Sequence, residues 1–370
     1  MTGPATETDR LDWLRLIRSQ NVGPETFFTL LRRFGSARAA LEALPDLAAA
    51  GGRQRPIVVA DPGRIERELT AAARLDVHYV FFGTAAYPPL LYEISGPPPV
   101  LTVRGDISLA QRPSIAVVGA RQASASGRTI ARTWAETFGR EGWTVVSGLA
   151  LGIDAEAHRG ALATGTVAVI AGGVDRPSPE ANLDLAAAIA DQGALVSEMP
   201  LGVEPFARLL VRRNRLIAGL SHGVVVVEAA AQSGALYTAD FAASAARDVF
   251  AVPGSPLDPR AAGCLKLLKE GATLAIDPRD IVDQLRPAQQ PMLPGFGEED
   301  DGRLPQETPS DVIDELRRAL SPAPVSVDTL VRVTGLATGT VIASLVELEL
   351  AGHAEREPNG MVRAATPAAG

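Results

Sequence analysis

Between residues 114 and 252, short runs of β-branched and other apolar residues alternate with longer segments of helical character. Near-continuous apolar strands separated by helices of about a dozen residues are typical of a parallel sheet that is covered on both faces. The expected strands are 115–118, 144–147, 167–171, 194–197, 224–227 and 249–252. The sequence therefore predicts an α/β fold whose centre, over residues 83–286, is an extended, Rossmann-like, doubly wound parallel sheet.

The first 82 residues carry apolar side chains at helical spacing, with Leu11, Leu14 and Ile17 on one face and a turn at residues 21–24. This pattern indicates an N-terminal helical domain of the SAM or helix-hairpin-helix type. The turn around Gly23 has two interpretations, and the sequence favours neither. Its backbone amides bind phosphate, as in helix-hairpin-helix modules, or the hairpin serves only for packing.

Downstream of residue 286 the composition changes, because residues 287–309 contain several prolines and the acidic run 298–301. Such a segment is typical of a flexible linker. Residues 310–370 predict a winged-helix domain, with helices over 311–320, 327–334 and 338–350 and a small β-wing over 353–363. The presumptive recognition helix contains Glu347 and Glu349 and no basic residue. We therefore expect protein docking or self-regulation from this domain rather than DNA reading.

The net charge of −8, from 35 basic and 43 acidic residues, argues at first sight against nucleic-acid binding. Residues 287–370 hold 6 of the basic and 13 of the acidic side chains, so most of the deficit lies in the tail. The single cysteine, Cys264, excludes a disulfide framework and a Cys-rich zinc site. No apolar run approaches the roughly 18 residues of a membrane helix. We expect a cytoplasmic protein with no membrane insertion and no metal.

Glycines follow several of the predicted strands, as in Gly119-Ala-Arg121 and Ser147-Gly148. Ligands of open parallel sheets bind outside the carboxyl ends of the strands, where glycine lets backbone amides approach a phosphate. These strand ends therefore predict an anionic ligand. The sequence contains no G-x-G-x-x-G motif, and its only lysines are Lys266 and Lys269, so a standard dinucleotide site and a Walker A loop are excluded.

The densest positive cluster lies just before an apolar helical run at residues 216–220. Arginine is unfavourable at the positive end of a helix dipole unless an anion neutralises it, so the cluster favours ligand binding over a solvated helix start. Arg121, just past the first strand, is expected beside this cluster, on the rim formed by the carboxyl ends of the strands. The cluster consists of Arg208, Arg212, Arg213, Asn214 and Arg215.

Three alternatives remain at this point. Asp154 and His158, one helical turn apart, are either an acid–base pair or, as we favour, a carboxylate at a helix start and a packed histidine. Glu198 or Glu228, each at a strand end, could serve as a general acid or base in an enzyme that acts on a nucleotide. A protein adaptor that uses the sheet only as a scaffold is the third alternative.

Several segments resemble the DprA/Smf family of DNA-processing proteins, in order and in spacing. They are 118–121, 147–158, 213–221, 227–229, 233–238, 251–254 and 263–272. The resemblance implies a cytoplasmic protein, without catalysis or cofactor, that binds and protects incoming single-stranded DNA in natural transformation and loads the RecA recombinase. It also implies a homodimer formed through the Rossmann-like domain.

The same resemblance assigns roles to individual residues. Arg121 would contact backbone phosphate, Ser147 and Gly148 would offer hydroxyl and amide donors, and Arg213 with Asn214 would complete the pocket. The full set of expected DNA-binding residues is Gly119, Arg121, Ser147, Gly148, Arg208, Arg212, Arg213, Asn214 and Arg215. Such a site reads no base edges, so binding should tolerate any sequence and weaken with salt.

The chain departs from the family pattern at three places. Leu210-Val211 stands where an aromatic residue and proline are common, which removes a stacking platform. Arg208 stands near the position of a common lysine. The loop 177–179 is Pro-Ser-Pro where the family usually has Tyr-Pro.

Overall fold

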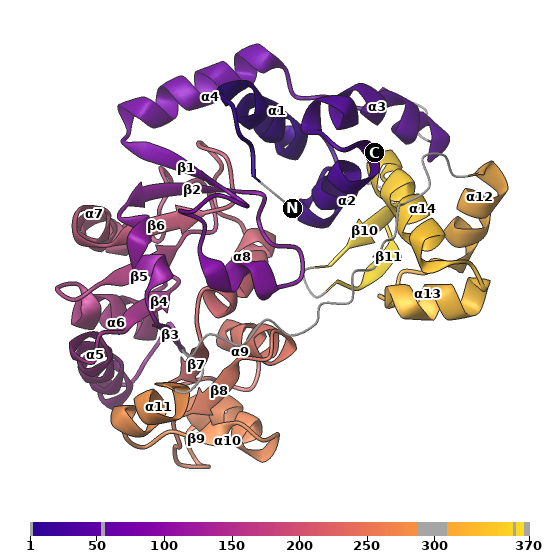
Figure 1. Cartoon of the computed structure of the whole chain (residues 1–370). Helices are drawn as coiled ribbons and strands as arrows, with labels where there is room; N and C mark the ends of the chain where they lie inside the picture. Colours follow the sequence, from indigo (N-terminus) through magenta and orange to yellow (C-terminus); the bar gives the residue numbers. More distant parts are fainter. Residues whose placement is uncertain (1–2, 53–55, 287–308, 358–359, 366–370) are drawn as a thin grey trace.

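The computed structural model describes residues 3–52, 56–286, 309–357 and 360–365. Three parts follow one another along the chain: a bundle of N-terminal helices, a large α/β domain and a small C-terminal domain (Figure 1). The C-terminal domain packs beside the N-terminal helices, although the whole α/β domain separates them in sequence.

One sheet dominates the α/β domain, with nine strands among the described residues in the order β1-β2-β6-β5-β4-β3-β7-β8-β9. The strands from β6 to β9 in this order are parallel, and β2 pairs antiparallel with both β1 and β6. The strands are β1 Val77–Phe81, β2 Val100–Gly105, β3 Ser114–Val118, β4 Thr144–Ser147, β5 Thr166–Val169, β6 Ala194–Ser197, β7 Gly223–Val226, β8 Asp248–Ala251 and β9 Thr273–Leu274.

All six strands predicted from sequence are present as β3 to β8, within two residues at each end. The predicted parallel sheet is confirmed over these strands, and β1 and β2 extend it by an antiparallel pair that the sequence analysis did not include. β1 also lies before residue 83, where we expected the domain to begin. Apolar runs did not predict this hairpin, because a proline-rich stretch separates β1 from β2.

Helices cover both faces of the sheet, as predicted for a doubly wound domain. One face packs against α5, α6, α7 and α11, and the other against α8, α9 and α10 (Figure 1). These helices are α5 Ala125–Arg140, α6 Ile153–Ala161, α7 Leu183–Gln192, α8 Ala207–Gly219, α9 Gly234–Ser244, α10 Ala262–Lys269 and α11 Pro278–Leu285. β3 lies between β4 and β7, so the direction of the crossovers reverses there. This reversal opens a crevice at the carboxyl ends of β3 and β7.

The described residues of the N-terminal domain form four helices around an aromatic core that includes Trp13 and Phe27. A capping box between Thr6 and Asp9 begins the first helix, and Gly35 ends the second in a left-handed conformation. The helices are α1 Glu7–Arg18, α2 Pro24–Phe34, α3 Ala37–Ala50 and α4 Pro62–Arg74. The predicted helical hairpin is therefore confirmed.

The C-terminal domain has the predicted winged-helix form, with three helices and a two-stranded wing. Its elements are α12 Ser310–Ala319, α13 Val327–Thr334, α14 Thr338–Ala351, β10 Ala354–Arg356 and β11 Val362–Ala364. The linker predicted over 287–309 lies outside the described residues except for Pro309. Within the described ranges no single helix is long and apolar enough to cross a membrane; α13 and α14 reach that length and apolarity only as a pair bent by 112°.

Candidate nucleic-acid interface

The rim above the carboxyl ends of β3 and β4 is built around a buried arginine. Arg213 extends from α8 into the interior, where its Nη1 donates to the backbone carbonyls of Gly148 (2.6 Å) and Val169. Burial lowers the pKa of Arg213 to about 10, so it keeps its charge at neutral pH. A Cβ on residue 148 would lie 2.6 Å from this guanidinium, which explains the glycine. Arg213 therefore holds the ends of two neighbouring strands together.

Asp154 balances this buried charge from the first turn of α6. Its carboxylate accepts from the backbone amide of Gly148 at 3.2 Å and from that of Ala150 at 3.4 Å. Burial raises the pKa of Asp154, and the charge of Arg213 counteracts that rise. The amide of Gly148 thus already has an acceptor within the protein.

His158, one turn after Asp154, is fully buried and packed. Its Nε2 accepts from the amide of Leu149 at 3.3 Å, and its Nδ1 lies 2.7 Å from the hydroxyl of Thr166. Burial and the nearby arginines lower the pKa of His158 to about 3, so the ring is neutral. The interpretation of Asp154 and His158 as a helix-start carboxylate and a packed histidine agrees with these contacts.

The loop after β4 is held in a conformation that the sequence did not reveal. Leu149 has φ +59°, a left-handed backbone that a bulky side chain rarely adopts. The buried side chain of Asn182 holds the loop, because its Nδ2 donates to the carbonyls of Leu149 (2.9 Å) and Ala150 (3.2 Å). Such strained residues concentrate at functional sites. The sequence signals for this loop were its place at a strand end and its membership of the family-like segment 147–158.

The arginine cluster of α8 does not form one exposed patch, contrary to our expectation. Arg215 is buried, where it pairs with Glu198 and donates to the carbonyl of Gly96 at 2.7 Å. Arg212, whose side chain is 34% exposed, bonds to the same carboxylate at 2.9 Å. Burial opposes ionisation of Glu198, but the two arginines outweigh it and hold its pKa below the usual value.

Two further predicted donors are also engaged inside the protein. The hydroxyl of Ser147 is buried and donates to the carbonyl of Val117 at 2.6 Å. Asn214 is buried as well, and its Nδ2 donates to the carbonyl of Gly234 on the neighbouring helix α9 at 3.2 Å. In this structure, Ser147, Gly148, Arg213, Asn214 and Arg215 thus support the rim from below instead of facing solvent.

Arg121 is different, because its side chain is exposed and has no ion-pair or hydrogen-bond partner among the described residues. Gly119, at the end of β3, is half-buried. The loop that carries Arg121 is fixed against α6, where the amide of Ile153 donates to the carbonyl of Ala120 at 3.2 Å. Gly152 (φ +78°) allows this approach, since a Cβ there would lie 2.3 Å from the same carbonyl oxygen.

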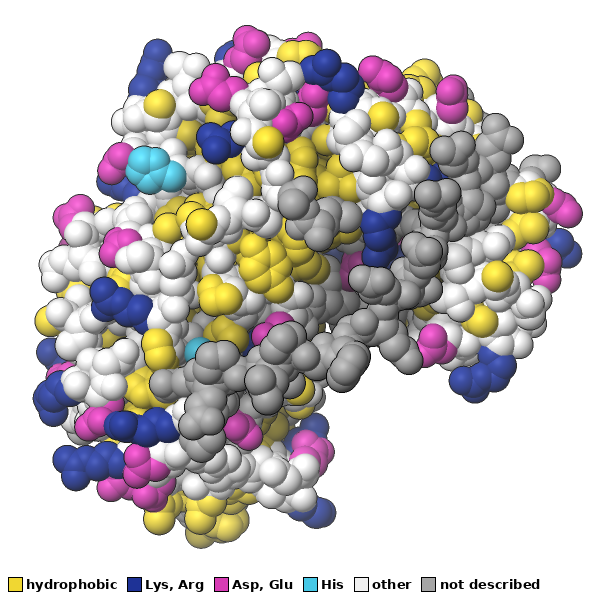
Figure 2. Space-filling model, viewed as in Figure 1, with side chains coloured by type: hydrophobic (Ala, Val, Ile, Leu, Met, Phe, Trp, Pro, Cys, Tyr) yellow, Lys and Arg dark blue, Asp and Glu magenta, His cyan; other side chains and the backbone are white. Residues whose placement is uncertain are grey.

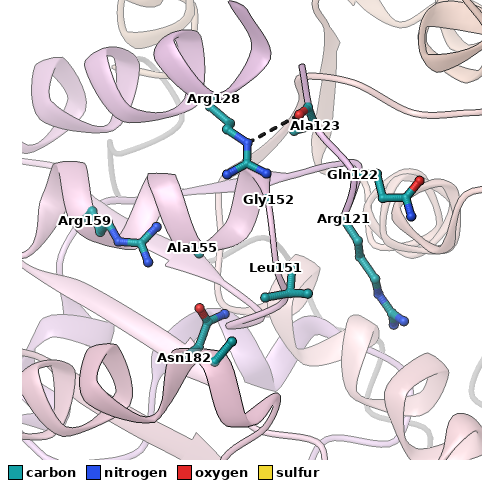
Figure 3. A pocket seen from close by; sticks show the side chains of 10 residues that line it. Arg121, Gln122, Ala123, Arg128, Leu151, Gly152, Ala155, Arg159 and Asn182 are labelled. Carbon is teal, nitrogen blue, oxygen red and sulfur yellow. Dashed lines mark hydrogen bonds between the residues drawn. The ribbon is translucent and has the colours of Figure 1, made fainter. Parts of the chain in front are cut away.

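An open cavity of about 500 Å³ lies beside Arg121 and contains two arginines that sequence reasoning missed (Figure 3). Arg128 extends from the first turn of α5 and donates to the carbonyl of Ala123, and Arg159 extends from α6 beside Glu156. In Figure 3 both guanidinium groups point into the same space, while Arg121 lies on the other side of Leu151. The sequence did offer a signal for Arg128, because a cation in the first turn of a helix is unfavourable unless an anion binds beside it.

The two strand-end carboxylates considered for catalysis are both engaged. Glu198 holds Arg212 and Arg215. Glu228 lies at the N-terminus of α5 and accepts from the amide of Ser124 at 2.9 Å and from its hydroxyl at 2.5 Å. In many nucleotide-binding sheets a helix N-terminus at the crossover reversal binds the ligand phosphate, and here the protein's own carboxylate occupies that position.

The described residues on the face of the molecule drawn in Figure 2 form no broad basic area. On the side shown in Figure 2, basic and acidic side chains are interspersed. Three apolar or aromatic side chains are exposed in this part of the chain. They are Phe206 (55%), which precedes α8, Val211 (37%) on α8 and Tyr237 (51%) on α9. The two helices pack against each other.

Comparison with known proteins identifies the family of each part of the chain. Residues 78–286 match the family of DNA recombination-mediator protein A, residues 7–71 match the DprA-like N-terminal HHH domain, and residues 303–360 match the DprA winged-helix domain. Protein Smf of Escherichia coli is 37% identical over 302 residues, which cover 81% of this chain and 80% of that protein. Protein Smf of Synechocystis is 37% identical over 303 residues, which cover 74% and 76%.

Solved structures agree with this match. The structure of DNA processing protein A from Streptococcus pneumoniae superposes with a TM-score of 0.62 at 31% identity, covering 77% of this chain and 99% of that one. A structure of the Helicobacter pylori protein, which concerns its single-stranded DNA binding mode, gives a TM-score of 0.52 at 26% identity and covers 56% and 95%. With its helical, Rossmann-like and winged-helix parts in the same order as these matches, the chain belongs to the DprA/Smf family of DNA recombination-mediator proteins.

Proposed function

We propose that this protein binds single-stranded DNA along the rim at the carboxyl ends of β3 and β4, and that in the cytoplasm it protects the strand and loads the RecA recombinase onto it. The observation that carries the proposal is Arg121, an exposed and unpaired cation beside a cavity that contains two further arginines, in a chain of this family. The printed subject of the H. pylori structure, single-stranded DNA binding, supports the same ligand.

Contact and support are divided between two sets of residues in this proposal. Arg121, Arg208 and Arg212 contact phosphates, because their side chains are wholly or partly exposed. Arg213 acts through the strand ends that it joins, so it is a positioning residue. Gly119, Ser147, Gly148, Asn214 and Arg215 give the rim its shape.

Stacking of bases is proposed for the exposed aromatic side chains. Phe206 and Tyr237 are about half exposed, and Phe206 lies two positions before Arg208 in the sequence, although Leu210 replaces the usual aromatic residue of the family. A stacked base contributes about 1–3 kcal/mol and tolerates any sequence. Binding should therefore combine a salt-dependent part from arginines with a salt-independent part from stacking.

The homodimer is proposed to form at the other end of the sheet. β9 is the edge strand there; Leu274 (53% exposed) lies on it and Ile276 (68%) follows it, while Leu257 (93%) lies in the loop after the neighbouring strand β8. Large exposed apolar side chains beside an open sheet edge favour pairing with a second copy. Two rims on one dimer would raise the effective concentration of one strand at the second site.

The test is binding of labelled oligo-dT and its duplex across a salt series. Arg121→Gln should weaken binding to every sequence and reduce the slope of log affinity against log salt by about 0.7, the value for one phosphate contact on a single strand. Arg74→Gln on α4 removes the same charge from an exposed position away from the rim and should change little beyond the general charge effect. Equal affinity for duplex and single strand would contradict the proposal.

The two other classes of function make different predictions in the same assay. The alternative of a nucleotide enzyme assigned acid–base chemistry to Glu198 or Glu228, and both carboxylates are engaged within the protein. A protein adaptor needs no affinity for DNA at all. Absence of binding at low salt would therefore reject the proposal and favour these alternatives.

A further inference from the structure

The wing of the C-terminal domain reaches the proposed DNA rim. The carboxylate of Glu355, on β10, forms an ion pair with the guanidinium of Arg208 on α8. Gly360, beyond β10, lies against the segment that precedes β2, where a Cβ would be 3.3 Å from the hydroxyl of Ser95. Figure 1 shows the wing on the side of the winged-helix domain that faces the sheet domain. Arg208, one of the three proposed phosphate contacts, is therefore occupied by an acidic side chain from another domain, whereas Arg212 pairs with Glu198 of its own domain.

This position of the wing follows from extensive docking of α14 on the N-terminal helices. Arg33 of α2 and Glu347 of α14 form an ion pair at 2.9 Å, with only 1% of each side chain exposed. Thr26 donates to Glu349 at 2.7 Å, and Asn21 donates to the carbonyl of Leu350 at 3.1 Å.

Apolar packing joins the two domains at the same place. Val346 and Leu350 belong to the hydrophobic core of the N-terminal domain. Gly51, at the end of α3, allows the close approach, since a Cβ there would be 2.2 Å from the carbonyl oxygen of Glu347. The acidic face that argued against DNA reading is thus the face that docks on this chain's own α2 and α3.

The contact of the wing with Arg208 is much weaker than the docking of α14. The side chain of Arg208 is 70% exposed, and exposed ion pairs contribute about 0.2–1 kcal/mol. Glu355 also pairs with Arg363 at 2.9 Å, so its charge is shared between two arginines. A phosphate arriving from solvent can therefore replace Glu355 at Arg208 without first unfolding the interface.

We propose that the wing is an internal competitor of single-stranded DNA, in which Glu355 occupies Arg208 until a phosphate of the strand displaces it. The docked α14 keeps Glu355 at a high local concentration beside the rim, and the exposure of the pair keeps the exchange reversible. This inference rests on the proposed DNA-binding function. It gives the acidic winged-helix domain a role that requires no further partner.

A double-mutant cycle in the full-length protein tests the competition with labelled oligo-dT at fixed salt. Glu355→Gln should tighten binding two- to fivefold, which corresponds to the energy of an exposed pair. In the Arg208→Gln background the same change should have no effect, because the contested cation is absent. Glu315→Gln, on the exposed side of α12, makes the same change in net charge and should leave affinity unchanged.

The outcomes separate this inference from the proposed function. An unchanged affinity of Glu355→Gln, or an equal gain with and without Arg208, would overturn the competition, the second result pointing to a general charge effect. Failure of the unmodified protein to bind oligo-dT would instead reject the proposed function. Thermal unfolding of each variant identifies any loss of folding, and we expect it to stay unchanged because Arg208 and Glu315 are exposed and Glu355 is partly exposed.

Discussion

The buried ion pair between Arg33 and Glu347 makes the docking of the winged-helix domain open to a quantitative test. Glu347→Leu removes the carboxylate and leaves Arg33, 1% exposed, without this partner. Breaking a buried pair on one side costs about 3–5 kcal/mol, because the remaining charge stays out of water. Val346 and Leu350 of the same helix pack in the N-terminal core, and the guanidinium is almost completely removed from water. We therefore expect Glu347→Leu to reduce the free energy of docking of α14 by about 3–5 kcal/mol.

The chain can avoid that cost by undocking. If the interface is worth less than about 3 kcal/mol, α14 separates from α2 and Arg33 becomes hydrated. Hydrogen exchange measured by mass spectrometry reports this directly: amides of α14 and α2 should exchange about a hundredfold faster in Glu347→Leu, while amides of β3 to β8 should not change.

The double variant Arg33→Met with Glu347→Leu replaces the pair by apolar side chains of similar size. Its exchange should return to within a few-fold of the unmodified protein, because such replacements of buried pairs are neutral or stabilising. Unchanged exchange of α14 in the single variant would refute the reasoning, since it would mean that Arg33 is not held in the interface by Glu347.

Three further predictions test the interior of the site and its surface. The pKa of His158 is about 3 in the folded protein and 6.5 in the unfolded chain, so the unfolded chain takes up the proton first as the pH is lowered. The contribution of His158 to the free energy of unfolding should therefore be complete above pH 6.5 and decrease below it, by up to about 1.4 kcal/mol per pH unit. Urea unfolding between about pH 7 and 5 should show this slope, and His158→Gln should flatten it. Gly51→Ala places a methyl group on the carbonyl of Glu347, so it should raise hydrogen exchange in α14, whereas Gly142→Ala, with open space at its Cβ, should lose stability by its backbone strain (φ +84°) and leave that exchange unchanged. Tyr237→Ala should weaken oligo-dT binding by about 1–3 kcal/mol without altering its salt slope; a changed slope would exclude stacking as its role.

Local patterns were sufficient for most of the fold. The six apolar runs became β3 to β8, and the winged helix and N-terminal hairpin formed where apolar spacing predicted them. These elements depend on the burial of side chains at regular intervals, which a sequence displays directly. The hairpin of β1 and β2 was missed because its strands pair across a proline-rich segment, and pairing partners are not a local property.

The direction of each arginine was decided only by tertiary structure. Arg212, Arg213 and Arg215 are almost consecutive, and on a helix such residues point in different directions. Arg213 is stable in the interior because Asp154 and the carbonyls of Gly148 and Val169 surround its guanidinium. Arg215 is stable there because it pairs with Glu198.

The motifs therefore determined the family and the rim, whereas the fold determined which cations remain exposed. The same holds for Glu347, whose partner Arg33 lies 314 positions earlier in the chain. A buried charge is stable only when the whole fold brings an opposite charge or a set of dipoles to it, and no local pattern specifies where that partner comes from.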